Sequence, residues 1–371
     1  MNFSIAKDAF ARVLYISNSI VERRNTMPIL ANVRITAEKD SIAIAATDLE
    51  VSLLGVAQAK VKTPGSITVD AKVLYEIVRE LPDNEIVVQV GKANRLEIES
   101  GQSRFKINGT SAEEFPAIVG TAMKNPIAVD ATKIYEMLEK TAFSVSTDET
   151  RYNINGVFVQ TIDGGKGGLL RFVATDGHRL AMIERPAEGL SLPSSVIVPR
   201  KGIQELKKVL EGNDGVAEVG TSEGFFTVKS GDITLGIRLV DGQFPDYQQV
   251  IPKTSSTEVT VSTQELLSAV KRVSLVTTDK NKAIRVKLIG GNLLISSQSP
   301  EYGEASENLS VDQQGEDVTI GFSAKYLVDI LNAMSKEDSV KIKFSGELGP
   351  GLFTSPDNDS YTCVVMPMRF E

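Results

Sequence analysis

The sequence repeats one pattern three times, at a spacing that fits a whole domain. Helix-like segments that start with similar residues lie at 69–74, 198–203 and 322–327. Their lysines, Lys72, Lys201 and Lys325, are 129 and 124 positions apart. Two further series keep this period: 46–50 with 174–178 and, more weakly, 296–300; and 114–116 with 243–245 and 365–367. A period this long corresponds to a domain, because solenoid repeats are far shorter. The 371 residues are therefore predicted to form three homologous domains, at 1–125, 126–254 and 255–371.

Each copy has the same expected elements. Apolar residues at helical spacing predict a first helix at 7–18, 131–142 and 263–274, and a second at 71–81, 200–210 and 324–334. Asp130 and Ser262 precede two of these helices and are typical N-caps. Short β-type segments with Gly, Asn and Asp turns fill the remainder, such as 85–90, 96–99, 216–219, 225–228 and 340–344. The predicted class is α+β, with two helices packed on antiparallel sheets in each domain.

Charge is distributed unevenly along the chain. Asp plus Glu is 48 and Lys plus Arg is 40, so the net charge of −8 excludes a generally basic nucleic-acid binder. The predicted helices nevertheless carry many cations: Lys7, Arg12, Lys72, Arg79, Lys133, Lys140, Arg200, Lys201, Lys207, Lys208, Lys271, Arg272, Lys325 and Lys336. If the domains form an arc with the helices inward, the concave surface is positive and attracts a phosphate backbone without reading bases. The alternative is that these are ordinary solvated helix faces.

The rarest residues exclude several kinds of site. The one cysteine, Cys363, rules out an intrachain disulfide and a thiolate-rich metal centre, and the one histidine, His178, rules out a multi-histidine site. We therefore expect no metal and no cofactor. No apolar run reaches the roughly 18 residues of a transmembrane span, and the first residues do not resemble a signal peptide. A cytoplasmic protein that does not contact membranes is expected.

Possible catalytic motifs are incomplete. The glycines at 164–168 lack the spacing of a phosphate-binding loop, and 355–360 lacks the Gly and Glu of a calcium loop. Asp176 and His178 have no activated nucleophile beside them, and Cys363 lies in an apolar run typical of a buried strand. No catalytic residue is assigned, and the chain is predicted not to be an enzyme. A hydrolase that uses Asp176 and His178 is kept as an alternative.

Five motifs resemble one family along the entire chain: Thr-Met-Pro-Ile-Leu at 26–30, Arg-Tyr-Asn-Ile-Asn-Gly-Val at 151–157, Ala-Thr-Asp-Gly-His-Arg-Leu-Ala at 174–181, Phe-Pro-Asp-Tyr at 244–247, and the tail 361–369. The family is the β subunit of bacterial DNA polymerase III, the sliding clamps. The resemblance implies three DNA-clamp domains in a chain whose head-to-tail homodimer is a six-domain ring. It implies a non-catalytic processivity factor for DNA replication that encircles duplex DNA.

The resemblance also implies partners. They are double-stranded DNA of any sequence, the replicative polymerase's catalytic subunit, the clamp loader, other clamp-binding polymerases, repair proteins and a second copy of the chain. The alternative function is a peptide-binding scaffold of the same fold that does not encircle DNA.

Three sets of site residues are expected. DNA contacts are carried over to Arg24 and Tyr152, and the helix lysines Lys72, Lys201 and Lys325 join them. The partner-peptide pocket between the second and third domains matches Ile154, Thr175, Gly177, His178, Arg179, Leu180, Pro245, Val250, Val364, Met366, Pro367 and Met368. The dimer contact matches Phe105, Ile107, Leu275 and Val276. The alternatives are a half-buried strand position for Tyr152 and ordinary core for the other two sets. Asn153 and Gln249 replace an aromatic residue and an arginine that are frequent in the family.

Overall fold

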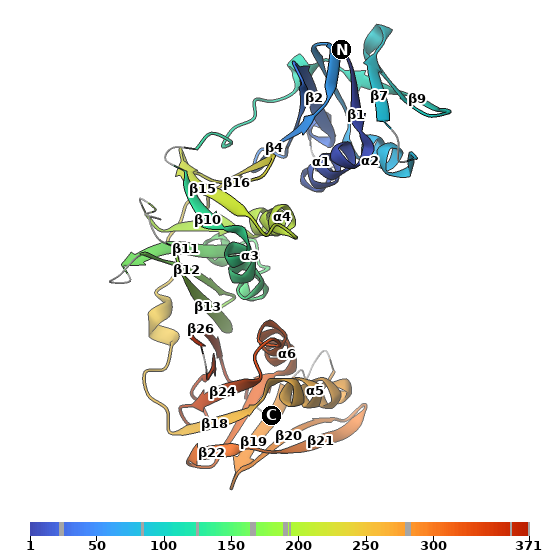
Figure 1. Cartoon of the computed structure of the whole chain (residues 1–371). Coiled ribbons are helices and arrows are strands. Elements are labelled where there is room, and N and C mark those ends of the chain that lie inside the picture. Colours follow the sequence, from blue (N-terminus) through green and yellow to red (C-terminus); the bar gives the residue numbers. More distant parts are fainter. Residues whose placement is uncertain are drawn as a thin grey trace. The chain divides into compact units, whose positions relative to one another are not determined.

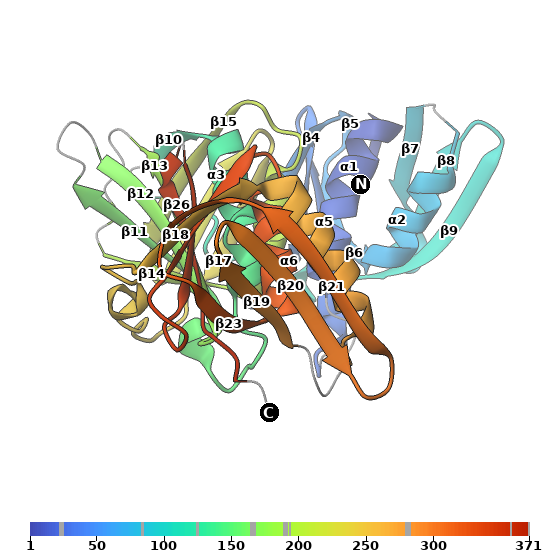
Figure 2. The ribbon, with the colours of Figure 1, turned by 90° about the horizontal axis from the view of Figure 1, so that it is seen from below.

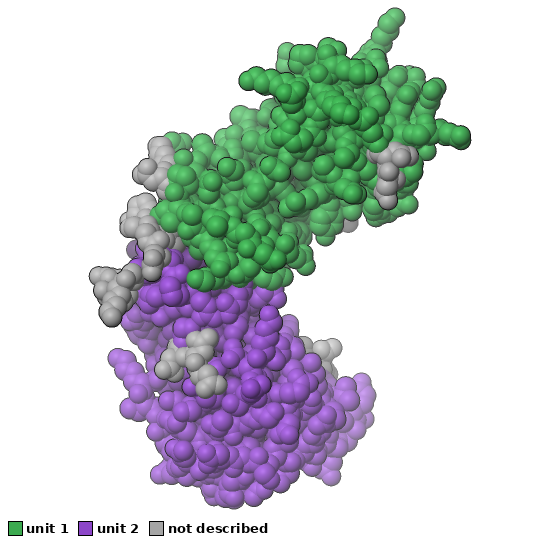
Figure 3. Space-filling model, in the orientation of Figure 1, with its two compact units in different colours: residues 1–135, 198–239 green, residues 136–197, 240–371 purple. Residues whose placement is uncertain are grey.

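The computed structural model describes residues 1–21, 26–82, 85–123, 126–163, 168–187, 192, 194–278, 283–356 and 358–369. The chain (Figure 1) divides into two compact units (Figure 3). The first contains residues 1–135 and 198–239, and the second contains residues 136–197 and 240–371. Each unit combines one outer predicted domain with part of the middle one. The predicted joint near 124–126 begins at residues outside those described.

Antiparallel strands of the first unit form one extended sheet. They pair in the order β10-β15-β16-β17-β4-β3-β2-β6-β9-β8-β7-β1-β5. Their bounds are β1 Asn2–Ala6, β2 Asn32–Glu38, β3 Ser41–Thr47, β4 Val51–Gln58, β5 Lys60–Thr63, β6 Gly65–Asp70, β7 Glu85–Val90, β8 Arg95–Ser100, β9 Ser103–Thr110, β10 Ile127–Asp130, β15 Val216–Ser222, β16 Phe225–Ser230 and β17 Ile233–Arg238. Alternate residues of a strand such as β2 are buried, because one face of the sheet is covered by helices.

The second unit holds two groups of paired strands. One runs in the order β11-β12-β13-β26-β25-β24-β18-β22, and the other in the order β21-β20-β19-β23. The bounds are β11 Gly156–Asp163, β12 Gly168–Thr175, β13 Arg179–Pro186, β18 Thr257–Ser262, β19 Ala283–Ile289, β20 Asn292–Ser299, β21 Gly303–Ser310, β22 Asp312–Gly315, β23 Val318–Ser323, β24 Ser339–Phe344, β25 Gly351–Ser355 and β26 Asn358–Val365. Strand β14 (Val196–Pro199) lies where the chain returns to the first unit.

The helices follow the predicted periodicity closely. Their bounds are α1 Lys7–Ile20, α2 Ala71–Glu80, α3 Ala131–Glu139, α4 Arg200–Leu210, α5 Thr263–Val273 and α6 Ala324–Ala333. Helix α1 packs against α2 and lies on β3 and β4, while α5 packs against α6 and lies along β20 and β21 (Figure 2). The two predicted caps are present: Thr132 donates its N–H to Asp130 Oδ1 at 2.9 Å, and Glu265 donates to Ser262 Oγ at 3.4 Å.

Helix α3 is shorter than predicted. It ends at Glu139 instead of residue 142, and a 3-10 turn, η4 (Ala142–Ser144), follows. Thr141 leaves the helical conformation with φ −126° and ψ −36°. Its hydroxyl donates to the carbonyl oxygen of Met137 at 2.7 Å, and this bond satisfies one of the last helical carbonyls. A local side-chain bond therefore overrides the apolar periodicity that predicted a longer helix.

Strand pairing crosses both predicted domain boundaries. Strand β4 pairs with β17, with Val51 opposite Ile237, and β13 pairs with β26, with Arg179 opposite Val365. Val51 and Arg179 are 128 positions apart, as are Ile237 and Val365. The two junctions therefore use equivalent strands in the same register. Main-chain hydrogen bonds join consecutive domains at each one.

Lys140 is not one of the solvated helix cations that the sequence predicts. Its side chain is 8% exposed, and its Nζ lies 3.0 Å from Glu337 Oε1 and 3.8 Å from Glu136 Oε1. Its Nζ also lies 4.8 Å from the centroid of the buried Tyr361 ring. The prediction is wrong because the carboxylate that draws Lys140 inward is 197 residues away in the chain. Burial raises the pKa of Glu337, but the hydrogen bond and charge of Lys140 outweigh it, so the net pKa is lowered.

We predict that Lys140→Met destabilises the protein by about 1–3 kcal/mol at neutral pH, because it leaves the Glu337 carboxylate, which is 22% exposed and still bonded to Ser355, without its cation. Urea unfolding measures the effect, and Lys133→Met, on the exposed face of α3, is the control. The Glu337 pKa is lower in the folded state, so its contribution is present above its unfolded pKa. The difference between variant and wild type should therefore shrink as the pH falls through the folded pKa. An unchanged urea midpoint would contradict this role for Lys140.

Candidate functional site

A pocket of about 190 Å³ opens in the second unit. It is bordered by η5 (Tyr152–Ile154), the turn between β12 and β13, the short helix η6 (Tyr247–Val250) and the end of β26. The lining residues are Arg151, Ile154, Thr175, Gly177, His178, Arg179, Leu180, Pro245, Asp246, Tyr247, Val250, Val364 and Met366. Segments more than 200 positions apart meet here, because β13 and β26 are neighbouring strands of one sheet.

The pocket floor is apolar and tightly packed. Leu180, Tyr247 and Val364 are 2%, 8% and 1% exposed, and they belong to one cluster with Val173 and Leu352. The Tyr247 hydroxyl accepts hydrogen bonds from Gln160 Nε2 at 2.7 Å and Arg171 Nη1 at 2.8 Å. These bonds satisfy the polar end of a ring that is otherwise buried among apolar groups. The floor is therefore a preformed surface for apolar side chains.

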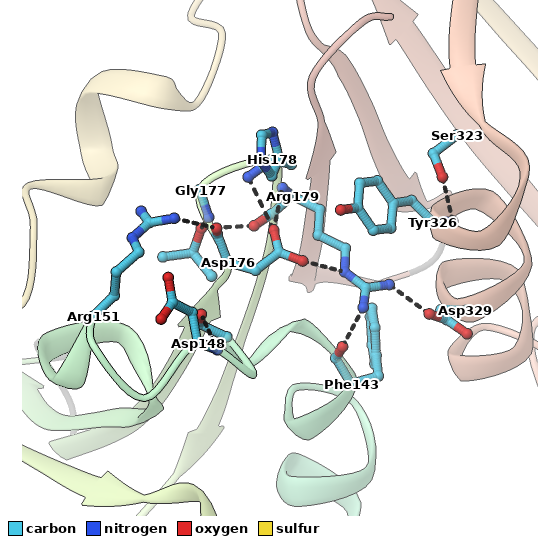
Figure 4. Close-up of polar contacts among 12 residues, drawn as sticks. Phe143, Asp148, Arg151, Asp176, Gly177, His178, Arg179, Ser323, Tyr326 and Asp329 are labelled. Atoms are coloured by element: carbon cyan, nitrogen blue, oxygen red, sulfur yellow. Dashed lines mark hydrogen bonds and ion pairs between the residues drawn. The ribbon is translucent and has the colours of Figure 1, made fainter. Parts of the chain in front are cut away.

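A tight turn forms one wall (Figure 4). Thr175 Oγ1 accepts the N–H of Gly177 at 3.1 Å and donates to the carbonyl oxygen of Arg179 at 2.6 Å. Asp176 Oδ1 accepts the N–H groups of His178 at 2.9 Å and Arg179 at 3.0 Å. Gly177 has φ +90°, a conformation that side chains with a Cβ rarely adopt. Side-chain oxygens thus hold the turn in one shape.

The rim of the pocket includes Met366, which has a flexible side chain and a hydrogen-bonded main chain. Met366 is 39% exposed, and its N–H donates to the carbonyl oxygen of His178 at 2.9 Å. Two polar groups lie nearby: Arg151 Nη1 donates to the carbonyl oxygen of Asp176 at 3.0 Å, and Gln249 Nε2 donates to Asp246 Oδ2 at 2.9 Å. An unbranched thioether above a rigid floor suits ligands of different shape.

Ten of the twelve residues expected for the pocket line it. Pro367 and Met368 follow Met366 in the chain but are not among the lining residues, and the Met368 N–H is bonded at 2.8 Å to the carbonyl oxygen of Gly321. Sequence reasoning missed Arg151, Asp246 and Tyr247. All three stand in the motifs at 151–157 and 244–247. Their place inside these motifs could have identified them as pocket residues.

At the junction of β4 and β17, the position that corresponds to the pocket floor is covered by main chain. Gly236 is 128 positions before Val364 and pairs with Ser52 in the register in which Val364 pairs with Leu180. A Cβ on Gly236 would lie 2.3 Å from the carbonyl oxygen of Gly120, which Thr227 Oγ1 also contacts at 2.7 Å. The main chain near Gly120 therefore covers Gly236 directly.

The residues expected to contact DNA differ in their surroundings. Arg24 lies outside the described residues. Tyr152 is 58% exposed, so the half-buried alternative does not hold, and Lys325 is exposed on α6. Lys72 is exposed on α2 with its Nζ 3.4 Å from Glu76. Lys201 is ion-paired with the buried Asp48, so a carboxylate already compensates its charge.

The residues expected at the dimer contact are not core residues of the chain. Phe105 on β9 is 38% exposed and Leu275 in the 3-10 turn η7 (Ser274–Val276) is 79% exposed. Ile107 and Val276 are partly exposed. The ordinary-core alternative therefore fails for all four.

The groups considered for catalysis have structural contacts. The carboxylate of Asp176 is bonded within its turn and to Arg179 Nε at 3.1 Å, while the His178 ring stacks on Tyr326 with centroids 6.4 Å apart. Cys363 is fully buried, and burial raises its pKa to about 12, so its thiolate is scarce at neutral pH. The glycines at 164–167 lie outside the described residues.

The described residues hold neither a candidate metal centre nor a membrane-spanning helix. Among them, no three or more His, Cys, Asp or Glu side chains are grouped to hold a metal ion. In the same part of the chain, no helix has the length and apolar character needed to cross a membrane.

Comparison with known proteins identifies the family. Three family models match: the N-terminal, central and C-terminal domains of the DNA polymerase III beta subunit, at residues 1–119, 128–246 and 248–369. The chain belongs to the DNA polymerase III beta subunit family. The beta sliding clamp of Caulobacter vibrioides is 36% identical over 372 residues, with 100% of both chains covered. A structure of the Bartonella birtlesii sliding clamp bound to griselimycin has a TM-score of 0.94 at 35% identity, again over 100% of both chains. A structure of the Pseudomonas aeruginosa clamp has a TM-score of 0.93 at 34% identity, also covering 100% of both chains.

Membership of the family decides several expectations. The fold of three clamp domains, each with helices on antiparallel sheets, is confirmed. The chain is a processivity clamp of DNA replication and has no catalytic activity of its own, so the hydrolase alternative is wrong. The domain boundaries at 125 and 254 and the roles of individual site residues stay predictions.

Proposed function

We propose that two copies of this chain close head to tail into a ring around duplex DNA. The single observation that carries this proposal is a pair of unused strand edges. Strands β4, β13 and β21 occupy equivalent places in the repeat, as do β17, β26 and β9. Pairings β4–β17 and β13–β26 form within the chain, whereas β21 pairs only with β20 among the described strands. Strand β9 is paired with β8 on one side, and on the other it pairs with β6 only at Gly109 and Thr110, which leaves the edge at 103–108 unpaired in the part of the chain that the structure describes. The third pairing, β21 with β9, is available to a second copy.

The repeat also sets the register of this proposed contact. The hairpins β8–β9 and β16–β17 align Ser103 with Ile233, so the register of the two internal junctions places Gly303 opposite position 107 of the second copy, and 305 opposite 105. Phe105 and Ile107 then take the positions of Leu235 and Ile237, which are both 0% exposed in the internal junction. Their exposure in a single chain is what a missing partner strand would leave. A contact that closes after two subunits leaves neither of these two edges open.

We predict that Phe105→Ala combined with Leu275→Ala shifts the dimer toward monomers. Removing two apolar side chains from a buried contact costs about 2–5 kcal/mol for each large residue, which raises the dimer dissociation constant more than tenfold. Sedimentation equilibrium measures it. Leu348→Ala is the matched control, since Leu348 is 78% exposed and Leu275 is 79% exposed. A wild-type monomer at micromolar concentration would favour the non-encircling scaffold instead.

Retention on DNA would come from enclosure and weak, uniform contacts. Exposed cations such as Lys72 and Lys325 give sequence-independent attraction to phosphates, and Arg24 and Tyr152 are the further contacts that we propose. A net charge of −8 limits attraction elsewhere on the protein. Because phosphate contacts repeat at every step along the duplex, the ring can slide without a preferred position.

Loading onto nicked circular DNA tests the ring. With the clamp loader and ATP, the loaded protein should stay bound at a salt concentration that abolishes ordinary phosphate binding, and should leave once the circle is linearised. Gel filtration of the DNA complex measures retention, and linear DNA is the control. Equal salt sensitivity on circular and linear DNA would overturn the proposal.

The pocket in the second unit is proposed as the binding site for partner proteins. Its preformed apolar floor and its methionine rim fit a short extended peptide with a few apolar anchors. The partners proposed are the polymerase catalytic subunit, the clamp loader, other polymerases and repair proteins. They would exchange on one site in the cytoplasm, where we place the protein. The Bartonella clamp structure has griselimycin bound. We propose that this compound also binds the pocket of the present chain.

We predict that Met366→Ala weakens the binding of fluorescently labelled griselimycin by about tenfold, because it removes a flexible apolar contact worth roughly 1–3 kcal/mol. Fluorescence polarisation measures the dissociation constant. Met27→Ala is the matched control, since Met27 is 42% exposed and Met366 is 39% exposed. Unchanged affinity in Met366→Ala would contradict the assignment of the pocket.

A further inference from the structure

Arg179 begins β13, directly after the turn that forms one wall of the pocket. Its side chain is 6% exposed. The guanidinium donates to Asp329 Oδ2 at 2.6 Å, to the carbonyl oxygen of Phe143 at 2.5 Å and to Asp176 Oδ2 at 3.1 Å (Figure 4). Three of its five N–H donors are bonded and the side chain is almost fully buried, so this guanidinium has little capacity to bind a peptide in the pocket.

Helix α6 contacts the turn at two consecutive residues. The guanidinium carbon of Arg179 lies 4.5 Å from the centroid of the Tyr326 ring, and the His178 ring stacks on the same tyrosine at an interplanar angle of 20°. Tyr326 and Asp329 are three positions apart, so both project from one side of α6. Ser323 caps this helix by accepting the Tyr326 N–H at 3.4 Å, which fixes the first turn of the helix.

The internal bonds of the turn and its external contacts have different roles. The bonds of Thr175 and Asp176 are local and set the shape of the turn. Its position relative to the pocket floor depends on contacts from elsewhere. The exposed Arg151 supplies one such contact, to the carbonyl oxygen of Asp176. The buried Arg179 supplies contacts to both η4 and α6.

We propose that Arg179 is a positioning residue, which holds the turn at 175–179 against α6 so that a partner meets a preformed wall. This inference rests on the proposed binding role of the pocket. Thr175, Gly177 and His178 line the pocket from this turn. Binding to a wall that is already ordered avoids the entropic cost of ordering it during association. Partner affinity should then depend on Asp329, which is not a lining residue.

Two variants test the link to α6. Asp329→Asn keeps the size of the side chain but removes the charge that holds the guanidinium. Arg179→Lys keeps the positive charge but loses the planar fork and its packing on the rings. Both should raise the dissociation constant of labelled griselimycin about tenfold, as expected for loss of a charged hydrogen bond. Fluorescence polarisation is measured on the full-length protein well below its melting temperature.

A second ion pair on the same strand provides the control. Arg185 lies six positions after Arg179 on β13, and its Nε is 3.0 Å from Glu136 Oε2. Neither residue lines the pocket. Glu136→Gln should lower the melting temperature about as much as Asp329→Asn but leave griselimycin affinity unchanged. A purely structural role for Arg179 would instead lower the melting temperature without changing affinity.

The outcomes separate this inference from the proposed function. If Met366→Ala loses affinity while Asp329→Asn and Arg179→Lys bind like wild type, the positioning role is overturned and the pocket assignment stands. Equal weakening by Glu136→Gln and Asp329→Asn also overturns it, because the effect would then be general. If wild type does not bind the probe, or Met366→Ala binds it unchanged, the pocket assignment fails and the positioning role fails with it.

Discussion

Main-chain pairing between strands of consecutive domains is the interaction on which the rest of the structure depends. At both junctions, equivalent strands meet in the same register, with Val51 opposite Ile237 and Arg179 opposite Val365. Such pairing depends little on side-chain identity, so a repeated domain can reuse it while its surface residues diverge. It also fixes which residues stand at each end of the paired strands. The pocket lies at one of these ends, where the turn before β13 meets the end of β26.

One substitution within the repeat explains why the two junctions differ. At the first junction, Gly236 leaves room for the main chain at Gly120 to lie where a Cβ would otherwise be. At the second, the equivalent Val364 has a branched side chain, which forms part of the pocket floor. The segment that corresponds to Gly120 in the second repeat forms η6 (Tyr247–Val250) and borders an open pocket. A small residue thus closes one junction, and a β-branched residue keeps the other available for a ligand.

Sequence reasoning succeeded where the signal was local or repeated. Helix α4 has the predicted bounds of 200–210, because its apolar stripe and its place in the repeat agree. The residues of the turn that borders the pocket could be predicted, because Thr175 to Leu180 are consecutive in one motif. Lys140 was misjudged for the opposite reason, because its acidic partner, Glu337, lies far away in the chain. The ion pair of Lys201 with Asp48 is long-range in the same way. Only tertiary contacts could distinguish a solvated cation from a buried one.

The buried cations and the exposed ones have separate consequences for a protein that must slide. Lys140 and Arg179 are buried and Lys201 is partly exposed, and each is compensated by a carboxylate of the same unit, so their charges contribute little field outside the fold. Exposed lysines such as Lys72 and Lys325 keep an outward charge, moderated in Lys72 by Glu76. Weak attraction of this kind is screened by salt over about 8–10 Å. It can centre a duplex within a ring, but it cannot account for retention at high salt. Long residence on DNA therefore has to come from closure of the ring, which places the decisive free energy at the β9 and β21 edges.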